Sequence, residues 1–420
     1  MKYSDYNILT EEEGKYILYN SVTKASIRID EEFKNNYLSN DAINLLSSND
    51  YDFLVKNGFI VRKDKDELKE LEYMFNTSFF RTDVLNVALV PSLKCNFSCP
   101  YCFEKVVQDK YENDKYFDIL KKYATKNFHY HSSVQISLFG GEPLVKEKDM
   151  IDFLRYAKED SNKYNYKLKC NITTNGSLLN ENNVKAMLEC GLFAMQITLD
   201  GGRNSHNKTR CFAGGKPSFD LIIDKIKMVL NLTKNVDDFT MIIRVNLNNN
   251  SGEDLIEILD QFTLEERKKL FMMIRVVYNT DKYKEKNNNS LDNLKPFYKI
   301  VLDKGAQILK NHFYYQPCEA CVNSRFYYLM PDLTMWKCIN DLNYDKAMFG
   351  KILQDGTVKI EYDKMVSWYN AADCFSDSKC LKCKKLPDCF GGCVLKRIKT
   401  GIRNCKTYDM ACLPYCMMEK

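Results

Sequence analysis

The 420-residue sequence contains no apolar run long enough to cross a lipid bilayer, and its first residues, Met1 to Tyr6, are polar. It also lacks any dense block of charge of one sign, because the net charge of +5 is spread along the chain. Nucleic-acid binding is therefore not indicated. Cysteine is absent before Cys95 and, at 17 residues, is too sparse for a secreted disulfide scaffold. These absences predict a cytoplasmic protein that binds neither a membrane nor a nucleic acid.

The cysteines that are present lie in clusters. Three fall between Cys95 and Cys102, and eleven follow residue 317. In a cytosolic protein, clustered cysteines more often bind metal or carry out redox chemistry than form disulfides. The sequence therefore predicts metal centres at two places in the chain.

The first cluster has the spacing C-x3-C-x2-C, formed by Cys95, Cys99 and Cys102. Three thiolates so close together can hold three irons of a cubane [4Fe–4S] cluster and leave the fourth iron without a protein ligand. A cluster that only passes electrons takes four cysteines. An open position, as in catalytic zinc sites, is kept for a small molecule. The spacing thus favours a catalytic cluster.

From residue 84 onward, short apolar runs rich in Val, Ile and Phe alternate with helical patterns. The predicted strands span 84–90, 134–139, 168–173, 194–199, 241–247 and 271–277. The predicted helices between them span 115–128, 146–160, 181–190, 219–232 and 252–261. This alternation predicts an α/β fold with a parallel sheet and right-handed crossovers. In closed parallel barrels, catalytic groups gather at the carboxyl ends of the strands.

Glycines and polar residues stand at those strand ends. The second predicted strand is followed by Gly140-Gly141-Glu142-Pro143, where glycine allows close approach of the backbone to a ligand and Glu142 offers an acceptor for an ammonium group. The third is followed by Thr174-Asn175-Gly176-Ser177, and the fourth by Asp200, with Arg210 further on. An alternative role for Asp200 and Arg210 is that of a helix-capping and surface pair.

These motifs, in this order, closely resemble those of radical S-adenosylmethionine (SAM) enzymes. The resemblance implies a partial (β/α)6 barrel over residues 81–312 and a SAM-binding [4Fe–4S] cluster on the three cysteines of the first motif. It also implies reductive cleavage of SAM to a 5′-deoxyadenosyl radical. The residues that would bind SAM, by the same resemblance, are Tyr101, Gly140, Gly141, Glu142, Pro143, Thr174, Asn175, Ser177, Asp200 and Arg210.

Residues 1–80 contain no cysteine and are predicted to form a separate small domain. Strand-like runs at 16–20 and 25–30 enclose a turn, a helix is predicted over 31–47, and another strand follows Gly58. This order suggests a small winged-helix-like domain. Before a radical SAM core, it resembles the PqqD-like leader-peptide recognition element of enzymes that modify ribosomally made peptides. A plain structural brace for the barrel is the alternative.

The last part of the chain, residues 313–420, carries the signature Cys380-x2-Cys383-x5-Cys389-x3-Cys393. An all-cysteine structural zinc site is one interpretation of that spacing. The run also resembles the SPASM extension, which holds two auxiliary [4Fe–4S] clusters. By that resemblance, the ligands of the first auxiliary cluster are Cys338, Cys393 and one or both of Cys318 and Cys321. Those of the second are Cys380, Cys383 and Cys389, completed by Cys412 or, alternatively, by Cys405 or Cys416. A hairpin is predicted at Gly350 and a strand over 352–359.

The resemblance as a whole implies a radical SAM/SPASM peptide maturase. Its partners would be a precursor peptide with a leader and a small electron donor such as ferredoxin or flavodoxin, and its product a thioether (sactipeptide or ranthipeptide type) or a carbon–carbon crosslink. An anaerobic sulfatase-maturating enzyme is an alternative, although Ile339 occupies the place of the base in that group and leaves Asp341 as a candidate. A non-catalytic iron–sulfur or zinc protein is a third hypothesis, which predicts four ligands at every cluster.

Overall fold

The computed structural model describes residues 1–12, 14–39, 42–102, 104, 113–247, 251–276, 294–309, 319–340, 342 and 344–402. The chain divides into two compact units. Unit 1 comprises residues 1–80, 310–323 and 368–420, and unit 2 comprises residues 81–309 and 324–367. None of the described helices has the length and hydropathy that crossing a bilayer requires.

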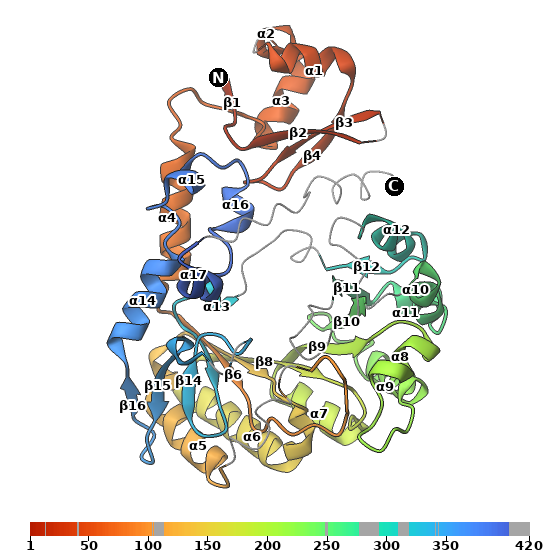
Figure 1. The fold of residues 1–420 in the computed structure, drawn as a ribbon, viewed down its shortest axis with the longest axis vertical. Helices are drawn as coiled ribbons and strands as arrows, with labels where there is room; N and C mark the ends of the chain where they lie inside the picture. The colour runs from red at the N-terminus through yellow and green to blue at the C-terminus, as the bar shows by residue number, and fades with distance from the viewer. Residues whose placement is uncertain are drawn as a thin grey trace. The chain divides into compact units, whose positions relative to one another are not determined.

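Unit 2 is built on one sheet, which within the described residues has the strand order β12-β11-β10-β9-β8-β7-β6-β13-β14-β15-β16 (Figure 1). Its central strands are β6 (Val84–Leu89), β7 (Ser133–Leu138), β8 (Lys167–Thr174), β9 (Leu192–Leu199), β10 (Thr240–Leu247) and β11 (Leu270–Val276). Each pairs in parallel with the next along the chain. The short strand β12 (Gln307–Ile308) continues this parallel sheet beside β11. The six strands predicted from the sequence are therefore confirmed, with nearly the predicted bounds.

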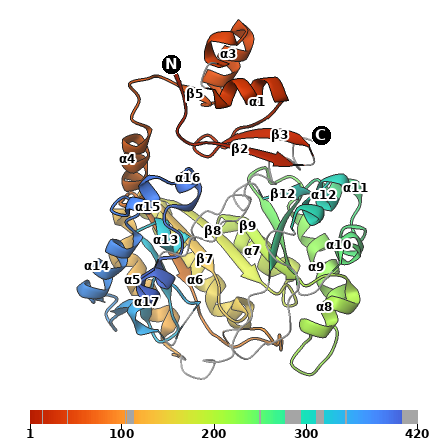
Figure 2. The same cartoon turned by 45° about the horizontal axis from the view of Figure 1, so that its top comes forward.

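The crossover helices cover one face of this sheet (Figures 1 and 2). They are α5 (Tyr116–Asn127), α6 (Glu147–Tyr164), α7 (Glu181–Glu189), α9 (Phe219–Leu232) and α10 (Gly252–Leu259), as predicted. Strand residues such as Ile136, Ile172 and Ile197 are fully buried beneath them. Because side chains alternate along a strand, the intervening residues point to the opposite face. That face is polar, with Thr198 and Arg244 paired in register across β9 and β10.

Unit 2 also contains shorter elements outside the repeated strand–helix units. Strand β13 (Phe326–Leu329) pairs in parallel with β6, and β14 (Thr334–Trp336), β15 (Met348–Ile352) and β16 (Val358–Ile360) follow in antiparallel pairing. The predicted hairpin near Gly350 is present, but the predicted strand over 352–359 is wrong. Its middle is a turn, in which the Leu353 amide donates to the Thr357 carbonyl at 2.8 Å and Gly356 adopts φ of +84°. Short helices α8 (Arg203–Thr209), α11 (Leu264–Arg267) and α12 (Lys295–Asp303) lie between the longer elements.

Unit 1 begins with two small sheets and several helices. Strands β2 (Asn7–Glu12), β3 (Lys15–Asn20) and β4 (Ser26–Ile29) pair antiparallel, and β1 (Lys2–Tyr3) pairs with β5 (Ile60–Val61). The helices are α1 (Glu31–Leu38), α2 (Ala42–Leu45), α3 (Ser48–Lys56) and α4 (Glu67–Phe79). The single helix predicted over 31–47 is therefore wrong, because α1 ends at Leu38 and α2 is separate. The strand β2 was not predicted, since its sequence, Asn-Ile-Leu-Thr-Glu-Glu, is largely polar.

The rest of unit 1 comes from the cysteine-rich part of the chain. It contains α13 (Glu319–Val322), α15 (Ser378–Leu381), α16 (Leu386–Cys389) and α17 (Val394–Thr400), and α14 (Tyr362–Ala372) crosses the boundary between the units. An apolar cluster joins Tyr6 and Leu71 to Cys374, Cys380 and Leu386. Side chains from residues 1–80 and from the Cys380–Cys393 segment therefore share one core.

A buried ion pair also connects the two parts of unit 1. The Lys24 ammonium contacts the carboxylate of Asp388, which is 1% exposed, and the Tyr19 hydroxyl donates to the same carboxylate at 3.1 Å. Lys24 also donates to the carbonyls of Ser21 (2.6 Å) and Pro387 (3.1 Å). These contacts fix the turn between β3 and β4 against α16.

Candidate active site

The loop after β6 carries the first cysteine motif. Cys99 is buried, and Cys95 and Cys102 are partly buried. The loop is attached to the segment after α8, because the Ser98 amide donates to the Cys211 carbonyl (3.0 Å) and the Phe97 and Phe212 rings pack edge to face at 4.9 Å. The conformation of this loop is therefore fixed by tertiary contacts as well as by its own sequence.

The Cys95 sulfur receives two N–H donors. The Phe97 amide lies 3.4 Å from Sγ and the Asn175 side-chain amide 3.7 Å. Burial raises the pKa of the Cys95 thiol to about 11. Among the described residues, no three His, Cys, Asp or Glu side chains converge closely enough to hold one metal ion. Ligation of an iron–sulfur cluster by Cys95, Cys99 and Cys102 thus stays a prediction. The two N–H groups that donate to the Cys95 sulfur are chemically compatible with a ligating thiolate.

The two glycines after β7 lie directly against the start of the cysteine loop. A Cβ at Gly141 would stand 2.4 Å from the carbonyl oxygens of both Leu93 and Lys94, and one at Gly140 would stand 2.5 Å from the Ser92 carbonyl. Gly140 also adopts φ of +128°, which favours glycine. These glycines allow the backbones of the loops that follow β6 and β7 to lie in direct contact. The fold itself therefore requires glycine at both positions.

Glu142 follows the glycines and is fully buried. Its carboxylate accepts hydrogen bonds from the Thr174 hydroxyl (2.7 Å), the Asn175 amide (2.7 Å) and the Leu144 amide (3.1 Å), the last of which caps the short helix η3 (Pro143–Lys146). Burial raises the pKa of Glu142, and the three hydrogen bonds act against that shift. A carboxylate has about four lone-pair sites, so at least one remains for a further donor.

The polar turn after β8 completes this side of the site. The Asn175 side chain donates to Asn96 Oδ1 at 2.8 Å and accepts from the Ser177 hydroxyl at 2.6 Å. The Asn96 amide in turn donates to the Ser177 hydroxyl at 2.9 Å. The structure therefore brings Thr174, Asn175 and Ser177 together with Glu142 and the cysteine loop.

A second buried cluster surrounds the phenol of Tyr101. Its hydroxyl donates to the Asp200 carboxylate and accepts from Arg210 Nη1 at 3.1 Å. The Asn246 side-chain amide lies 3.2 Å from Asp200 Oδ1, and the Thr209 hydroxyl 2.8 Å from Asp200 Oδ2. Asp200 and Arg210 are thus both part of a buried cluster around one tyrosine, which argues against the alternative of a surface pair.

Arg210 retains an unused donor in this cluster. Burial opposes its charge, but Tyr101, Cys99 and Asp200 together raise the pKa of its guanidinium. Its Nε is buried and makes no hydrogen bond. A buried guanidinium with an open N–H suits an anionic ligand such as a carboxylate. The residues therefore fit the SAM-binding role that the sequence predicts for them.

His206 holds the backbone under this cluster. The Asp200 amide donates to His206 Nδ1 at 3.2 Å, so the proton lies on Nε2, which donates to the Ser218 hydroxyl at 3.0 Å. Burial and the nearby Arg210 charge lower the pKa of His206 well below its usual value. The imidazole is therefore neutral and structural.

Two polar residues of this region were missed in the sequence. Asn246 stands at the end of β10, so the same rule that singled out the other strand ends would have found it. Glu104 follows the cysteine motif; it is 5% exposed, its Oε1 has no hydrogen-bond partner, and burial together with Glu142 raises its pKa to about 8. No spacing rule marks such a residue.

The cysteines predicted for the auxiliary clusters are only partly described. In unit 1 the Cys393 and Cys321 thiols form a hydrogen bond, which is the main cause that lowers the pKa of Cys393 to about 6. Cys380 is buried, Cys389 partly buried and Cys383 exposed, while Cys338 is buried in unit 2. Cys318, Asp341, Cys405, Cys412 and Cys416 lie outside the described residues.

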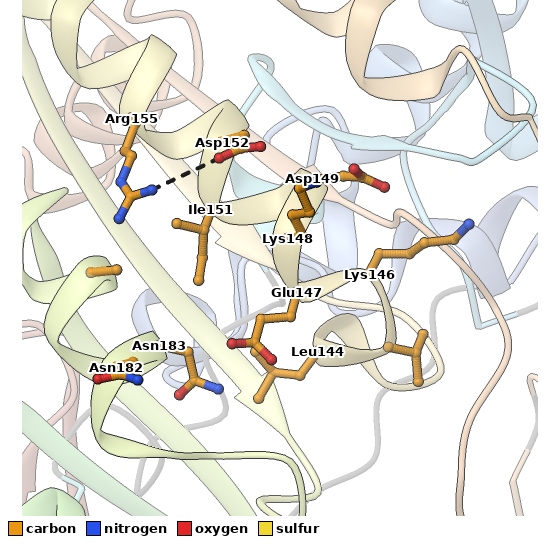
Figure 3. Close-up of a pocket in the computed structure, with 12 residues that line it drawn as sticks. Leu144, Lys146, Glu147, Lys148, Asp149, Ile151, Asp152, Arg155, Asn182 and Asn183 are labelled. Atoms are coloured by element: carbon orange, nitrogen blue, oxygen red, sulfur yellow. Dashed lines mark ion pairs between the residues drawn. The ribbon is translucent and has the colours of Figure 1, made fainter.

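A separate cavity of about 600 Å³ lies where η3 and the starts of α6 and α7 meet (Figure 3). Its walls carry both charges, including Lys146, Glu147 and an ion pair of 3.8 Å between Arg155 and Asp152. None of the predicted cofactor residues lines it. The cavity is therefore distinct from the cluster of residues at the strand ends.

The comparisons with known proteins agree with this geometry. A family profile described as the Radical SAM superfamily matches residues 89–262. The Fe-coproporphyrin III synthase of Methanosarcina barkeri is 30% identical over 127 residues, which are 30% of this chain and 29% of the synthase. The GTP 3′,8-cyclase of Clostridium perfringens is 28% identical over 232 residues (54% of this chain, 67% of the cyclase). The cysteine-type anaerobic sulfatase-maturating enzyme of Clostridium novyi is 29% identical over 171 residues (39% and 44%).

Two solved structures share the fold over more of the chain. The structure of anSMEcpe with bound AdoMet and Kp18Cys peptide has a TM-score of 0.57 and 17% identity, and covers 79% of this chain and 95% of that one. Streptococcus suis SuiB bound to precursor peptide SuiA has a TM-score of 0.52 and 18% identity, and covers 95% of this chain and 96% of that one. The predicted α/β fold with a radical SAM core is thereby confirmed. The chain spans only 29% of the length of the Methanosarcina barkeri synthase. Residues 89–262 form a radical SAM domain, the catalytic domain of a superfamily of enzymes.

Proposed function

We propose that the protein is a radical SAM/SPASM peptide maturase that cleaves SAM reductively, removes hydrogen from a ribosomally made precursor peptide and closes a thioether or carbon–carbon crosslink. The observation that carries the peptide assignment is the small antiparallel sheet β2-β3-β4 at the N-terminal end of a chain that has a radical SAM domain. Such a sheet offers an edge to which an extended peptide can add as a strand. The likeness in fold to SuiB, over 95% of the chain, supports this proposal.

The chain's own residues provide for SAM at the strand ends of unit 2. Glu142 has an acceptor site left for the ammonium group, and Arg210 has an open Nε–H for the carboxylate. Cys95, Cys99 and Cys102 would hold the cluster, with the Asn175 side chain donating to the Cys95 sulfur. When bound, the [4Fe–4S] cluster and SAM together supply one-electron chemistry that yields a 5′-deoxyadenosyl radical. The roles of Tyr101 and Asp200 are to position Arg210 and to exclude water from it.

We assign leader docking to residues 1–80, with β4 as the edge that the leader would join. The edge strand β2 begins at Asn7, whose carbonyl already accepts a hydrogen bond from Lys384 at 3.0 Å. Strand β4 instead presents Ile27 and Ile29, which are partly buried against the apolar core of this domain. An added strand would gain main-chain hydrogen bonds there and apolar contacts beside them.

The auxiliary clusters belong to the same proposal, with residues 313–420 as the SPASM domain. The thiol–thiol contact of Cys321 and Cys393 supports their assignment to one cluster. Cys338 would join them only by the resemblance of the sequence to the SPASM extension. Cys380, Cys383 and Cys389 would hold the other, completed by Cys412, Cys405 or Cys416. An auxiliary cluster would accept the electron released when the crosslink closes, and a small donor such as ferredoxin or flavodoxin would reduce the first cluster.

A second candidate is sulfatase maturation, which the similarity to the Clostridium novyi enzyme and to anSMEcpe favours. Two observations weigh against it. The position after Cys338 is Ile339, a buried apolar residue that cannot act as a base. The anSMEcpe fold covers 79% of the chain, whereas that of SuiB covers 95%.

The test uses the anaerobically reconstituted full chain, SAM, dithionite and a candidate precursor peptide encoded beside it. Peptide maturation predicts release of 5′-deoxyadenosine together with a mass loss of two hydrogens in the peptide. Replacing Ser26, the first residue of β4, by proline removes an edge amide; we expect this to lower leader affinity about fivefold while SAM cleavage continues. The Ser26→Ala variant is the control. Equal leader affinity in both variants would refute docking on β4.

A further inference from the structure

The chain directly after Cys383 is tied to the N-terminal domain (residues 1–80) within unit 1. The Ser21 hydroxyl donates to the Lys384 carbonyl at 2.5 Å, and the Lys384 ammonium donates to the Asn7 carbonyl at 3.0 Å. Ser21 and Asn7 are both fully buried, so these contacts are shielded from water. The backbone that follows the Cys383 thiol is therefore anchored by the N-terminal domain.

Cys389 is anchored by the same domain on both sides. Before it in the chain, the buried carboxylate of Asp388 pairs with the Lys24 ammonium. After it, the ring of Phe390 stacks on the ring of Phe75, with 5.1 Å between the centroids. The position of Cys389 thus depends on a cation and a ring that belong to the N-terminal domain.

Two of these residues keep their side chains in spite of backbone strain. Lys24 has φ of +64° and Phe390 has φ of +42°, in the left-handed region that favours glycine. Glycine at these positions could neither pair with Asp388 nor stack on Phe75. Strained conformations persist where the surroundings require them, and they are frequent at functional sites. The strain therefore indicates that the two contacts have a function.

Two short turns carry the cysteines themselves. The Cys383 amide donates to the Cys380 carbonyl at 3.0 Å, and the Cys389 amide donates to the Lys385 carbonyl at 3.0 Å. The first turn carries two thiols with the C-x2-C spacing of metal sites. A donor set made of thiolates suits an iron–sulfur cluster, so these residues fit the second auxiliary cluster assigned to them above.

We propose that Lys24 is a positioning residue for the second auxiliary cluster, so that the domain assigned to leader docking also helps to build a metal centre. Lys24 acts through the Asp388 carboxylate and through the Pro387 carbonyl, to which it donates at 3.1 Å. This inference rests on the auxiliary-cluster part of the proposed function. Groups that orient metal ligands from behind are typically worth about 10- to 100-fold in metal affinity.

The test measures iron in the anaerobically reconstituted full chain. We expect about twelve irons per chain in the wild type, from three clusters, and about eight in Lys24→Met. The release of 5′-deoxyadenosine from SAM with dithionite should stay near that of the wild type, because the first cysteine motif lies in unit 2. Lys56→Met is the matched control, since this lysine is exposed on α3 of the same domain, and should keep all of the iron.

A double variant separates positioning from stability alone. Lys24→Met leaves the Asp388 carboxylate buried without its cation, which by itself destabilises unit 1. Adding Asp388→Asn removes that unpaired charge but does not restore the link between Lys24 and the chain before Cys389. Positioning therefore predicts that the double variant also lacks one cluster, whereas a purely stabilising role predicts that it regains the iron.

Several results would overturn the inference. They are a full iron content in Lys24→Met, recovery of the iron in the double variant, an equal loss in Lys56→Met, and a wild type that holds only about four irons, enough for one cluster. Failure of the proposed function has a different readout. It would be seen as no mass change in any precursor peptide, while the iron contents of the wild type and the variants still follow the prediction.

Discussion

The carboxylate of Glu142 should control both SAM binding and the stability of unit 2. It is fully buried and accepts three hydrogen bonds, two of them at 2.7 Å. Replacement by alanine would leave three buried donors without partners, at a cost of about 1–3 kcal/mol each, which approaches the whole stability of a typical domain. The isosteric Glu142→Gln is more informative, because its amide oxygen keeps part of the network and only one donor then faces an NH2 group.

We expect Glu142→Gln to lose about 2 kcal/mol of unfolding free energy, from one unsatisfied buried donor. For a unit of this size that corresponds to a decrease in Tm of roughly 4–8 °C. The lost charge would also weaken SAM binding about 10- to 100-fold, the value of a hydrogen bond to a charged group.

The assay is calorimetric titration of SAM into anaerobic, cluster-loaded protein, with thermal unfolding measured on the same samples. Glu159→Gln, on the exposed face of α6, is the control and should match the wild type in both measurements. Wild-type SAM affinity in Glu142→Gln would refute the assignment of this carboxylate to the ammonium group. Wild-type Tm would show that the one hydrogen bond lost in this variant contributes little.

Three further predictions concern single residues. Gly141→Ala should abolish SAM binding, because its Cβ would stand 2.4 Å from two carbonyl oxygens and would displace the cysteine loop; retained binding in a titration would contradict this. Burial lowers the pKa of His206, so the unfolded chain takes up a proton near pH 6.5 and the folded chain does not. Between pH 7 and pH 5 the wild type should therefore lose about 2 kcal/mol more unfolding free energy than His206→Gln. Equal losses in the two proteins would refute the argument. Lys24→Met should cost unit 1 about 3–5 kcal/mol, because it leaves the Asp388 carboxylate buried without its cation, and an unchanged unfolding profile would count against it.

The sequence predicted the repeated part of the fold well because local patterns determine it. Each βα unit combines an apolar strand with an amphipathic helix, and the carboxyl ends of the strands marked Glu142, Asn175 and Asp200 in advance. Asn246 obeys the same rule at the end of β10 and was simply not selected.

What the sequence did not reveal depends on contacts between distant segments. Strand β13 is short and exists because it pairs with β6, far away in the chain. The contact of Cys321 with Cys393 follows from the folding of unit 1. No local pattern contains such information.

The central claim is that this chain cleaves SAM at a cluster held by Cys95, Cys99 and Cys102. The most direct measurement is the release of 5′-deoxyadenosine and methionine by anaerobically reconstituted protein with dithionite and SAM. We predict that the wild type releases both products and that Cys99→Ser, with its auxiliary iron retained, releases neither. A wild type that is fully loaded with iron and sulfide yet releases no 5′-deoxyadenosine would contradict the account.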